Sequence, residues 1–255
     1  MIKNKYLQKA VNWLLLLLLP VTVVALWQIS TTHGWVRRSI LPPPEGILES
    51  AQMLAKQGLL LDDFLATLFR IIKGFLIGSL IGIVLGIIIG LSPVADRLSK
   101  ILVAVFRPIP IIALIPILIL WMGIGEGSKV TVIVLGTFWA LMLNTISGIK
   151  SIDPKLLELC RMLRKGKAKT IFGVIIPSAF PSIYTGIRLA ASSSLAMSIT
   201  AEMLAAQKGI GYRIMYARNM ALPGVMFVGI IELGLLGMII DLLLLKGQDR
   251  ILKYR

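Results

Sequence analysis

The stretch GFLIGSLIGIVLGIIIG, residues 74–90, is apolar and has a glycine at every fourth position. With its apolar flanks it is long enough to cross the hydrocarbon core of a bilayer, which is roughly 30 Å thick. A four-residue spacing puts these glycines on one helix face, where the backbone of a second helix can approach closely. The stretch therefore predicts a membrane-spanning helix whose tightly packed face is formed by Gly74, Gly78, Gly82, Gly86 and Gly90.

The composition of the whole chain supports this class of fold. Hydrophobic residues make up 57% and charged residues 15% of the 255 residues, and the mean hydropathy is +0.88. Soluble proteins average about 45–50% apolar and about 25% charged residues. The composition excludes a disordered chain, a disulfide scaffold and a soluble nucleic-acid-binding protein, despite a net charge of +15. We expect an all-α polytopic membrane protein.

Six apolar windows are long enough to cross a bilayer as helices, which takes about 20 residues each. The first follows three lysines and resembles a secretory signal, but it lacks a small-residue cleavage site and is interpreted as a retained span. The third contains Pro108, Pro110 and Pro116, which predict a kinked or partly unwound helix. The windows are Val11–Ile29, Thr67–Leu91, Ile101–Ile124, Val130–Ile149, Pro181–Ala206 and Leu222–Leu245.

Lysine and arginine residues are distributed unequally between the two sides of these windows. With the N-terminus inside, the cytoplasmic segments hold 16 of them and the opposite side holds nine. Because cytoplasmic loops carry the excess of Lys and Arg, we expect six spans with both termini in the cytoplasm. Lys155–Lys169 is then cytoplasmic and Gly34–Gly58 extracytoplasmic.

The chain divides into two parts. Residues 1–66 hold the first span and an extracytoplasmic linker that contains the stiff run Leu41-Pro42-Pro43-Pro44, and residues 67–255 hold a five-helix core with a cytoplasmic loop over 150–180. Apolar residues in the linker recur at helical spacing. They fit an amphipathic helix on the outer membrane surface or an ordinary connecting helix. These residues are Ile47, Leu48, Ala51, Leu54 and Ala55.

The cytoplasmic loop over 150–180 contains the signals of a short helix. Asp153 is a suitable N-cap, Pro154 fits the first helical position, and Gly166 can end the helix. A helix this short cannot span a bilayer, so it lies on the membrane or docks in a groove of a cytoplasmic partner. Its predicted apolar face comprises Leu156, Leu159, Cys160 and Leu163.

Glu158-Leu159-Cys160, with Pro177 following 19 residues after the glutamate, resembles the EAA loop in permease subunits of binding-protein-dependent ABC importers. In that loop the glutamate precedes two alanines, a glycine lies six residues after it, and an Ile-x-Leu-Pro pattern follows. This chain differs at Leu159 and Cys160. Arg164 occupies the glycine position, which leaves the turn after the helix open.

Further stretches resemble the nitrate, sulfonate, taurine and bicarbonate group of these permeases, from about Leu41 to Leu245. The resemblance implies an all-α, type I ABC importer-like core in a bacterial inner membrane. It also implies a homodimer of permease chains, two cytoplasmic ATPase subunits and an extracytoplasmic solute-binding protein. The matching stretches are Leu41–Pro44, Arg107–Pro110, Ala113–Pro116, Leu120–Ile124, Pro177–Arg188, Ala201-Glu202 and Gly209–Tyr212.

The resemblance further implies that closure of the ATPases pushes on the helix that carries Glu158. The ATPase-coupling residues are then Asp153, Glu158, Leu159, Cys160, Leu163, Gly166 and Pro177. The chain has no Walker A pattern, so ATP and Mg²⁺ are expected in the partner ATPase and no cofactor in this chain. Its single cysteine and single histidine provide neither an internal disulfide nor a zinc cluster.

Polar side chains in the last two windows require partners or water, because they are costly in a membrane. The serines fit either a translocation pathway or helix packing. We expect Arg188 and Glu202 to form structural pairs, whereas Glu232 contacts a cationic or zwitterionic solute or pairs with a base such as Arg107. The candidate pathway residues are Ser192, Ser193, Ser194, Ser198, Glu202 and Glu232.

The resulting functional hypothesis is a permease subunit that imports a small polar solute, with sulfonate or taurine first and nitrate or bicarbonate as further candidates. Import of another small nutrient, such as a vitamin precursor, is an alternative within the same machinery. A proton-coupled secondary transporter is a second class, which usually shows two similar halves. A membrane-embedded enzyme is a third, for which no metal-ligand cluster or nucleophile and base pair stands out.

Overall fold

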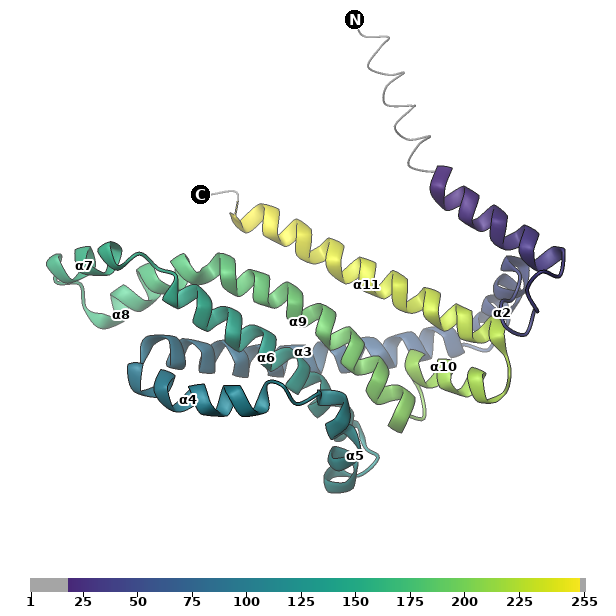
Figure 1. Cartoon of the computed structure of the whole chain (residues 1–255), viewed down its shortest axis with the longest axis horizontal. Helices are drawn as coiled ribbons and strands as arrows, with labels where there is room; N and C mark the ends of the chain where they lie inside the picture. The colour runs from purple at the N-terminus through teal and green to yellow at the C-terminus, as the bar shows by residue number, and fades with distance from the viewer. Residues whose placement is uncertain (1–17, 253–255) are drawn as a thin grey trace, which may run out of the picture. The chain divides into compact units, whose positions relative to one another are not determined.

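The computed structural model describes residues 18–252, and every regular element in that range is a helix (Figure 1). Two compact units are distinguished, one of Met1–Leu61 with Arg213–Ile231 and one of Asp62–Tyr212 with Glu232–Arg255. An apolar helix, Leu18–Thr32, comes first. The remaining helices are α2 Pro44–Lys56, α3 Leu59–Leu91, α4 Pro93–Phe106, α5 Ile111–Met122, α6 Glu126–Lys150, α7 Pro154–Met162, α8 Lys167–Thr170, η1 Ile171–Ile175, α9 Ile176–Ala205, α10 Ile210–Asn219 and α11 Pro223–Leu252.

The first unit is built around the apolar side of α2. Ile47 and Leu54 are buried in a cluster with Ala217, Val225 and Val228, residues that return from the C-terminal part of the chain. The unit thus joins two segments that lie far apart in the chain. The packed side of α2 fits a connecting helix better than a helix that lies free on a membrane surface.

The second unit is held together by close contact between α3 and α6. A Cβ added at Gly78 would lie 2.7 Å from the carbonyl oxygen of Val134, and one at Gly82 would lie 2.8 Å from that of Phe138. Added Cβ atoms at Gly74, Gly86 and Gly90 would likewise lie within 3 Å of α6 side chains. The glycine face of α3 therefore lies directly on the α6 backbone, as the four-residue spacing predicts.

α6 contacts α9 in the same manner on another side, which the glycine spacing of α3 does not predict. A Cβ at Gly136 would meet Met197 at 2.6 Å, and one at Gly148 would meet Ser182 at 2.7 Å. Gly186 of α9 lies equally close to Asn144 of α6, at 2.8 Å. α6 is thus the central helix of the unit, with small residues facing both neighbours.

The prolines of the third predicted window divide it into two helices. α4 and α5 meet at a bend of 91°, and Pro110 is the N-cap of α5 while Pro116 lies inside it. A proline removes a backbone donor and restricts the residue before it, so a helix ends readily at Arg107-Pro108-Ile109-Pro110. The expected kink is therefore a complete break.

The described residues contain four or five of the six spans expected. Among residues 18–252, four helices are long and apolar enough to cross a membrane, or five if α4 and α5 count as one broken span. Of the predicted span Val11–Ile29, the part before Leu18 lies outside the described residues, and the described helix Leu18–Thr32 is short.

Gly82→Leu is predicted to disrupt the contact between α3 and α6. The new side chain would meet the Phe138 carbonyl oxygen and Leu141, so α3 must move away, at a cost of about 1–3 kcal/mol or more. We expect loss of monodisperse permease in detergent and a lower unfolding temperature. Gly234→Leu is the matched control, because nothing lies within 4 Å of a Cβ at Gly234. Equal behaviour of the two variants would show that the glycine face is not a tight contact.

Candidate coupling helix and buried charge network

α7 is a short helix in the loop between α6 and the segment formed by α8, η1 and α9. Its N-terminus is capped by Asp153, whose Oδ1 accepts a hydrogen bond of 2.9 Å from the backbone N–H of Lys155. Pro154 occupies the first helical position, where its missing N–H costs nothing. The start of the helix is therefore set by local sequence, as predicted (Figure 1).

One side of α7 is anchored to the helices behind it. Cys160 is 4% exposed, and Leu157 packs against the core cluster that contains Ile149, Ile175 and Ala179. These contacts tie α7 to the end of α6 and to the segment that leads into α9.

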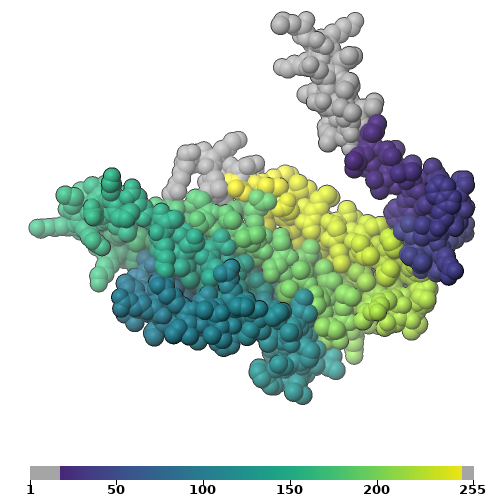
Figure 2. Space-filling view, viewed as in Figure 1, coloured from purple at the N-terminus to yellow at the C-terminus, as the bar shows by residue number. Residues whose placement is uncertain are grey.

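The other side of α7 is open and apolar, and it contains Leu159 and Leu163 of the predicted face of Leu156, Leu159, Cys160 and Leu163. Leu159 and Leu163 are 50% and 61% exposed, and Met162 is 82% exposed, while Glu158 is exposed beside them. Of the same predicted face, Cys160 is buried and Leu156 is partly buried. Figure 2 shows this segment, near residue 160, as a projecting tip.

α7 ends at Met162, and the prediction that Gly166 ends it was wrong. Arg164 has φ of +48°, the left-handed conformation that commonly terminates a helix, whereas Gly166 has φ of −61° and is the N-cap of α8. Arg164 stands where the EAA pattern has glycine. The turn is therefore retained, with an arginine in a conformation that glycine adopts more readily.

Pro177 lies in the first turn of α9, directly after the π-helical segment η1. A proline removes one donor from the helix and crowds the preceding turn, and a widened π turn accommodates both effects. As a result α8, η1 and α9 continue as one apolar segment from Lys167 to Ala205. The loop that holds α7 is thus connected to α9 without a flexible joint.

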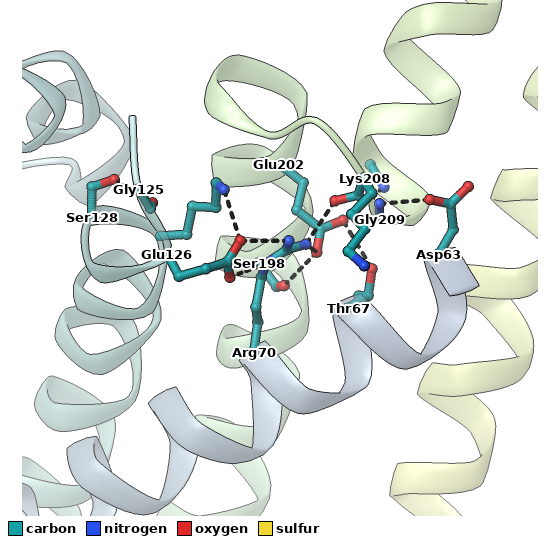
Figure 3. A network of polar contacts seen from close by, with 12 residues as sticks. Asp63, Thr67, Arg70, Gly125, Glu126, Ser128, Ser198, Glu202, Lys208 and Gly209 are labelled. Carbon is teal, nitrogen blue, oxygen red and sulfur yellow. Dashed lines mark hydrogen bonds and ion pairs between the residues drawn. The ribbon is translucent and has the colours of Figure 1, made fainter. Parts of the chain in front are cut away.

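At the opposite end of α3 and α6, a buried arginine joins three segments (Figure 3). Arg70 of α3 donates from Nε and Nη2 to the two carboxylate oxygens of Glu126, at 2.6 and 2.8 Å. Its Nη1 donates to Oε1 of Glu202 at 2.8 Å and to the backbone oxygen of Lys208 at 2.9 Å. Lys129 donates to Glu126 at 3.0 Å.

Glu202 of α9 is fully buried and holds the segment that follows α9 in place. Besides Arg70, its carboxylate accepts hydrogen bonds of 2.9 Å from the hydroxyl of Thr67 and from the backbone N–H of Gly211. Asp63 accepts a hydrogen bond of 2.7 Å from the backbone N–H of Gly209. Gly209 has φ of +125°, and a Cβ there would lie 2.6 Å from Glu202 Oε2, so only glycine fits.

This network was only half visible in the sequence. The expectation that Glu202 has a structural partner agrees with the structure, but the sequence analysis singles out neither Arg70 nor Glu126. The signal available in the sequence was that a cation and carboxylates lie near the ends of apolar windows, where each requires a partner. No spacing rule connects Arg70 with Glu202, since 132 residues separate them in the chain.

Arg188, Ser192 and Glu232 lie apart from this network. Arg188 pairs with Asp241 of α11 at 3.0 Å, so its expected structural pairing is also present. Ser192 is exposed beside this pair and lines a cavity of about 100 Å³ with it. Glu232 is 9% exposed in α11. Arg107, its suggested partner, is exposed at the C-terminus of α4.

The other three candidate serines make short-range or packing hydrogen bonds. Ser193 donates to the backbone oxygen of Gly136 on α6 at 3.1 Å, and Ser194 donates to Ala191 at 2.7 Å. Ser198 donates to Glu202 at 3.4 Å. These contacts are what the packing interpretation requires.

Among the described residues, no group of three or more His, Cys, Asp or Glu side chains could hold a metal ion.

Arg70→Ala is predicted to destabilise the permease strongly. It leaves Glu202 buried without its cation, a change that costs about 3–5 kcal/mol at comparable sites. The double variant Arg70→Leu with Glu202→Leu removes both charges and is expected to recover part of the loss. Thermal unfolding in detergent measures both effects, with the exposed Arg218→Ala as control. A double variant less stable than Arg70→Ala would show that the ion pair is not the source of the loss.

Comparison with known proteins identifies relatives over nearly the full chain. The family model "Binding-protein-dependent transport system inner membrane component" matches residues 78–251. The putative aliphatic sulfonates transport permease protein SsuC of Escherichia coli K12 is 40% identical over 238 residues, covering 93% of this chain and 89% of that protein. SsuC of Bacillus subtilis 168 is 33% identical, and the match covers 100% of this chain and 92% of that protein. An inward-facing structure of the MetNI methionine ABC transporter shares the fold, with a TM-score of 0.64 at 17% identity, covering 79% of this chain and 98% of that one.

Proposed function

The chain belongs to the family of inner membrane components of binding-protein-dependent transport systems, and on this basis we propose that it forms the permease of an ATP-driven importer for organosulfonates. The relatives named as aliphatic sulfonate permeases support this solute class, with alkanesulfonates and taurine as the leading candidates. The observation that carries the importer mechanism is α7, which is anchored by Cys160 and Leu157 and presents exposed residues to a partner.

The proposed assembly contains two copies of this chain, two cytoplasmic ATPase subunits and an extracytoplasmic solute-binding protein. α7 and both termini lie in the cytoplasm, in agreement with the excess of Lys and Arg there. The chain supplies no ATPase site, because it lacks a Walker A pattern, and ATP and Mg²⁺ bind to the partner subunits. The exposed apolar faces of α3, α4 and α11 are available to lipid and to the second copy.

In this mechanism the ATPase receives α7 in a groove. Leu159, Met162 and Leu163 supply apolar contact, and Glu158 supplies a carboxylate for a donor in the groove. When the ATPases close, they displace α7. Because Leu157 packs against the cluster at the ends of α6 and α9, these helices move with α7. The translocation pathway then closes to one side of the membrane and opens to the other.

Another small nutrient, such as a vitamin precursor, is the second candidate solute for the same machinery. ATP-dependent uptake by the reconstituted complex distinguishes the two. We expect uptake of ethanesulfonate or taurine that requires ATP and the cognate binding protein. Uptake of a neutral solute in their place would contradict the sulfonate assignment, and uptake driven by a proton gradient without ATP would contradict the importer mechanism.

Glu158→Lys is predicted to uncouple the permease from its ATPase. The donor in the groove loses its acceptor, which costs about 1–3 kcal/mol, and if that donor is a basic side chain the new lysine also repels it. We expect reduced recovery of the ATPase in a pull-down and loss of solute-stimulated ATP hydrolysis. Glu49→Lys makes the same charge reversal at an exposed position of α2 and serves as control. If solute stimulates ATP hydrolysis in Glu158→Lys as strongly as in the wild type, α7 is only a connecting segment and does not couple to the ATPase.

The proposed topology predicts opposite labelling of two exposed positions, Ser151 next to α7 and Gln52 in α2. Single cysteines at these sites, in a chain with Cys160 replaced, would be treated with a membrane-impermeant thiol reagent on intact cells. We expect Gln52→Cys to react and Ser151→Cys to be protected until the cells are permeabilised. The reverse labelling pattern would show that the chain has the opposite orientation in the membrane.

A further inference from the structure

A cavity of about 590 Å³ lies between α4 and the second half of α6, apart from the network around Arg70. Its volume falls within the range of about 300–1,000 Å³ that is typical of small-molecule sites. Apolar side chains such as Val103 and Leu143 form part of the wall. The charged residues that line it are Asp96, Lys100, Arg107 and Lys150.

The cavity carries an excess of positive charge, with three cations and one carboxylate. Asp96 forms ion pairs with both lysines: its Oδ1 lies 2.5 Å from Nζ of Lys150, and its Oδ2 lies 3.6 Å from Nζ of Lys100. Arg107 differs from these, since within residues 18–252 its guanidinium has neither a hydrogen bond nor an ion pair and its side chain is exposed. The single carboxylate is thus occupied by the lysines, and Arg107 is available to an external anion.

The position of Arg107 along α4 requires water rather than lipid around it. Lys150 is the last residue of α6, at the end that leads to α7, and its partner Asp96 lies in the first turn of α4. Arg107 follows Asp96 at a distance of about 16 Å in helical rise, roughly half the hydrocarbon thickness. An arginine facing lipid at such a depth costs at least about 2.5–3.5 kcal/mol. The cavity beside Arg107 is therefore hydrated in the assembled transporter.

We propose that this cavity is an aqueous vestibule that binds the sulfonate group of the translocated solute, with Arg107 as the ligand at its deep end. A planar guanidinium donates two parallel hydrogen bonds to neighbouring oxygens of a sulfonate. Lys100 and Lys150 lie nearer the α7 end of the cavity and attract the anion there. Asp96 limits the net positive charge, so that the solute can leave. This inference rests on the proposed importer function.

The first test measures the electrostatics of the cavity with a sulfonate as the probe. Ala104 lines the cavity and is exposed, so Ala104→Cys in a chain with Cys160 replaced reports access to it. The complex in phosphatidylcholine nanodiscs is treated with sulfonatoethyl or trimethylammonioethyl methanethiosulfonate. Arg107→Gln is expected to lower the ratio of anionic to cationic modification rates by about thirtyfold, because losing one charge about 8 Å away at a dielectric constant of about 40 slows the anionic reagent about fivefold and speeds the cationic reagent about as much. Arg97→Gln, also on α4 but outside the cavity lining, should leave the ratio unchanged.

The second test measures uptake of taurine or ethanesulfonate by proteoliposomes that contain the complete complex. Arg107→Gln is expected to lower the uptake rate at least about tenfold, the equivalent of about 1.4 kcal/mol. Arg107→Lys should retain part of it, and Arg97→Gln all of it. Millimolar taurine should also slow modification of Ala104→Cys by the anionic reagent.

Three outcomes separate the inference from its premise. If the unmodified complex imports no sulfonate, the proposed function fails and this inference fails with it, whatever the modification ratio. If it imports sulfonate but Arg107→Gln matches Arg97→Gln in both tests, the vestibule is overturned while the importer stands. Protection of Ala104→Cys by phosphatidylglycerol but not by taurine would assign the cavity to a lipid headgroup and also overturn the proposal.

Discussion

The close approach of α3 to α6 over a row of glycines is the contact on which the second unit depends. In a bilayer, apolar side chains gain little by leaving lipid for protein, so helices associate through van der Waals contact and hydrogen bonds. The backbone of α3 lies within van der Waals distance of α6 from Gly74 to Gly90, and α6 meets α9 as closely at Gly136 and Gly148. Three long helices are therefore fixed in register, because any sliding would drive a side chain into a backbone.

This register determines what lies at each end of the helices. Where Gly90 contacts Ile149, α6 ends and leads into α7, whose Leu157 packs back on the same cluster. At the other end, Arg70 lies one turn before Gly74 and reaches Glu126 and Glu202. The glycine contacts thus connect an exposed coupling helix to a buried ion network. We infer that a displacement of α7 moves both ends together as a rigid body.

Local sequence rules predicted the features that depend on local chemistry. The glycine face of α3, the cap at Asp153 and the break at Pro108 and Pro110 all follow from backbone sterics and hydrogen bonding within a few residues. The sequence does not show which residues of α7 are buried and which are exposed, because this depends on where the ends of α6 and α9 lie, which no periodicity encodes. The partner of Glu202 was missed for a related reason, since Arg70 reaches it only through the packing of α3 against its neighbours.

The rigid-body account is tested most directly by a distance within one chain. Spin labels at Met162 on α7 and at Lys208, both exposed and both in the second unit, would be measured in the reconstituted complex without nucleotide and in an ATP-trapped state. Mixing labelled with unlabelled chains restricts the signal to pairs within one permease. The account predicts that this distance changes by no more than about 2 Å, the size of small helix shifts, while the distance between the two α7 helices of the dimer changes clearly. A large change between Met162 and Lys208 would contradict it, because α7 would then move independently of the glycine-packed core.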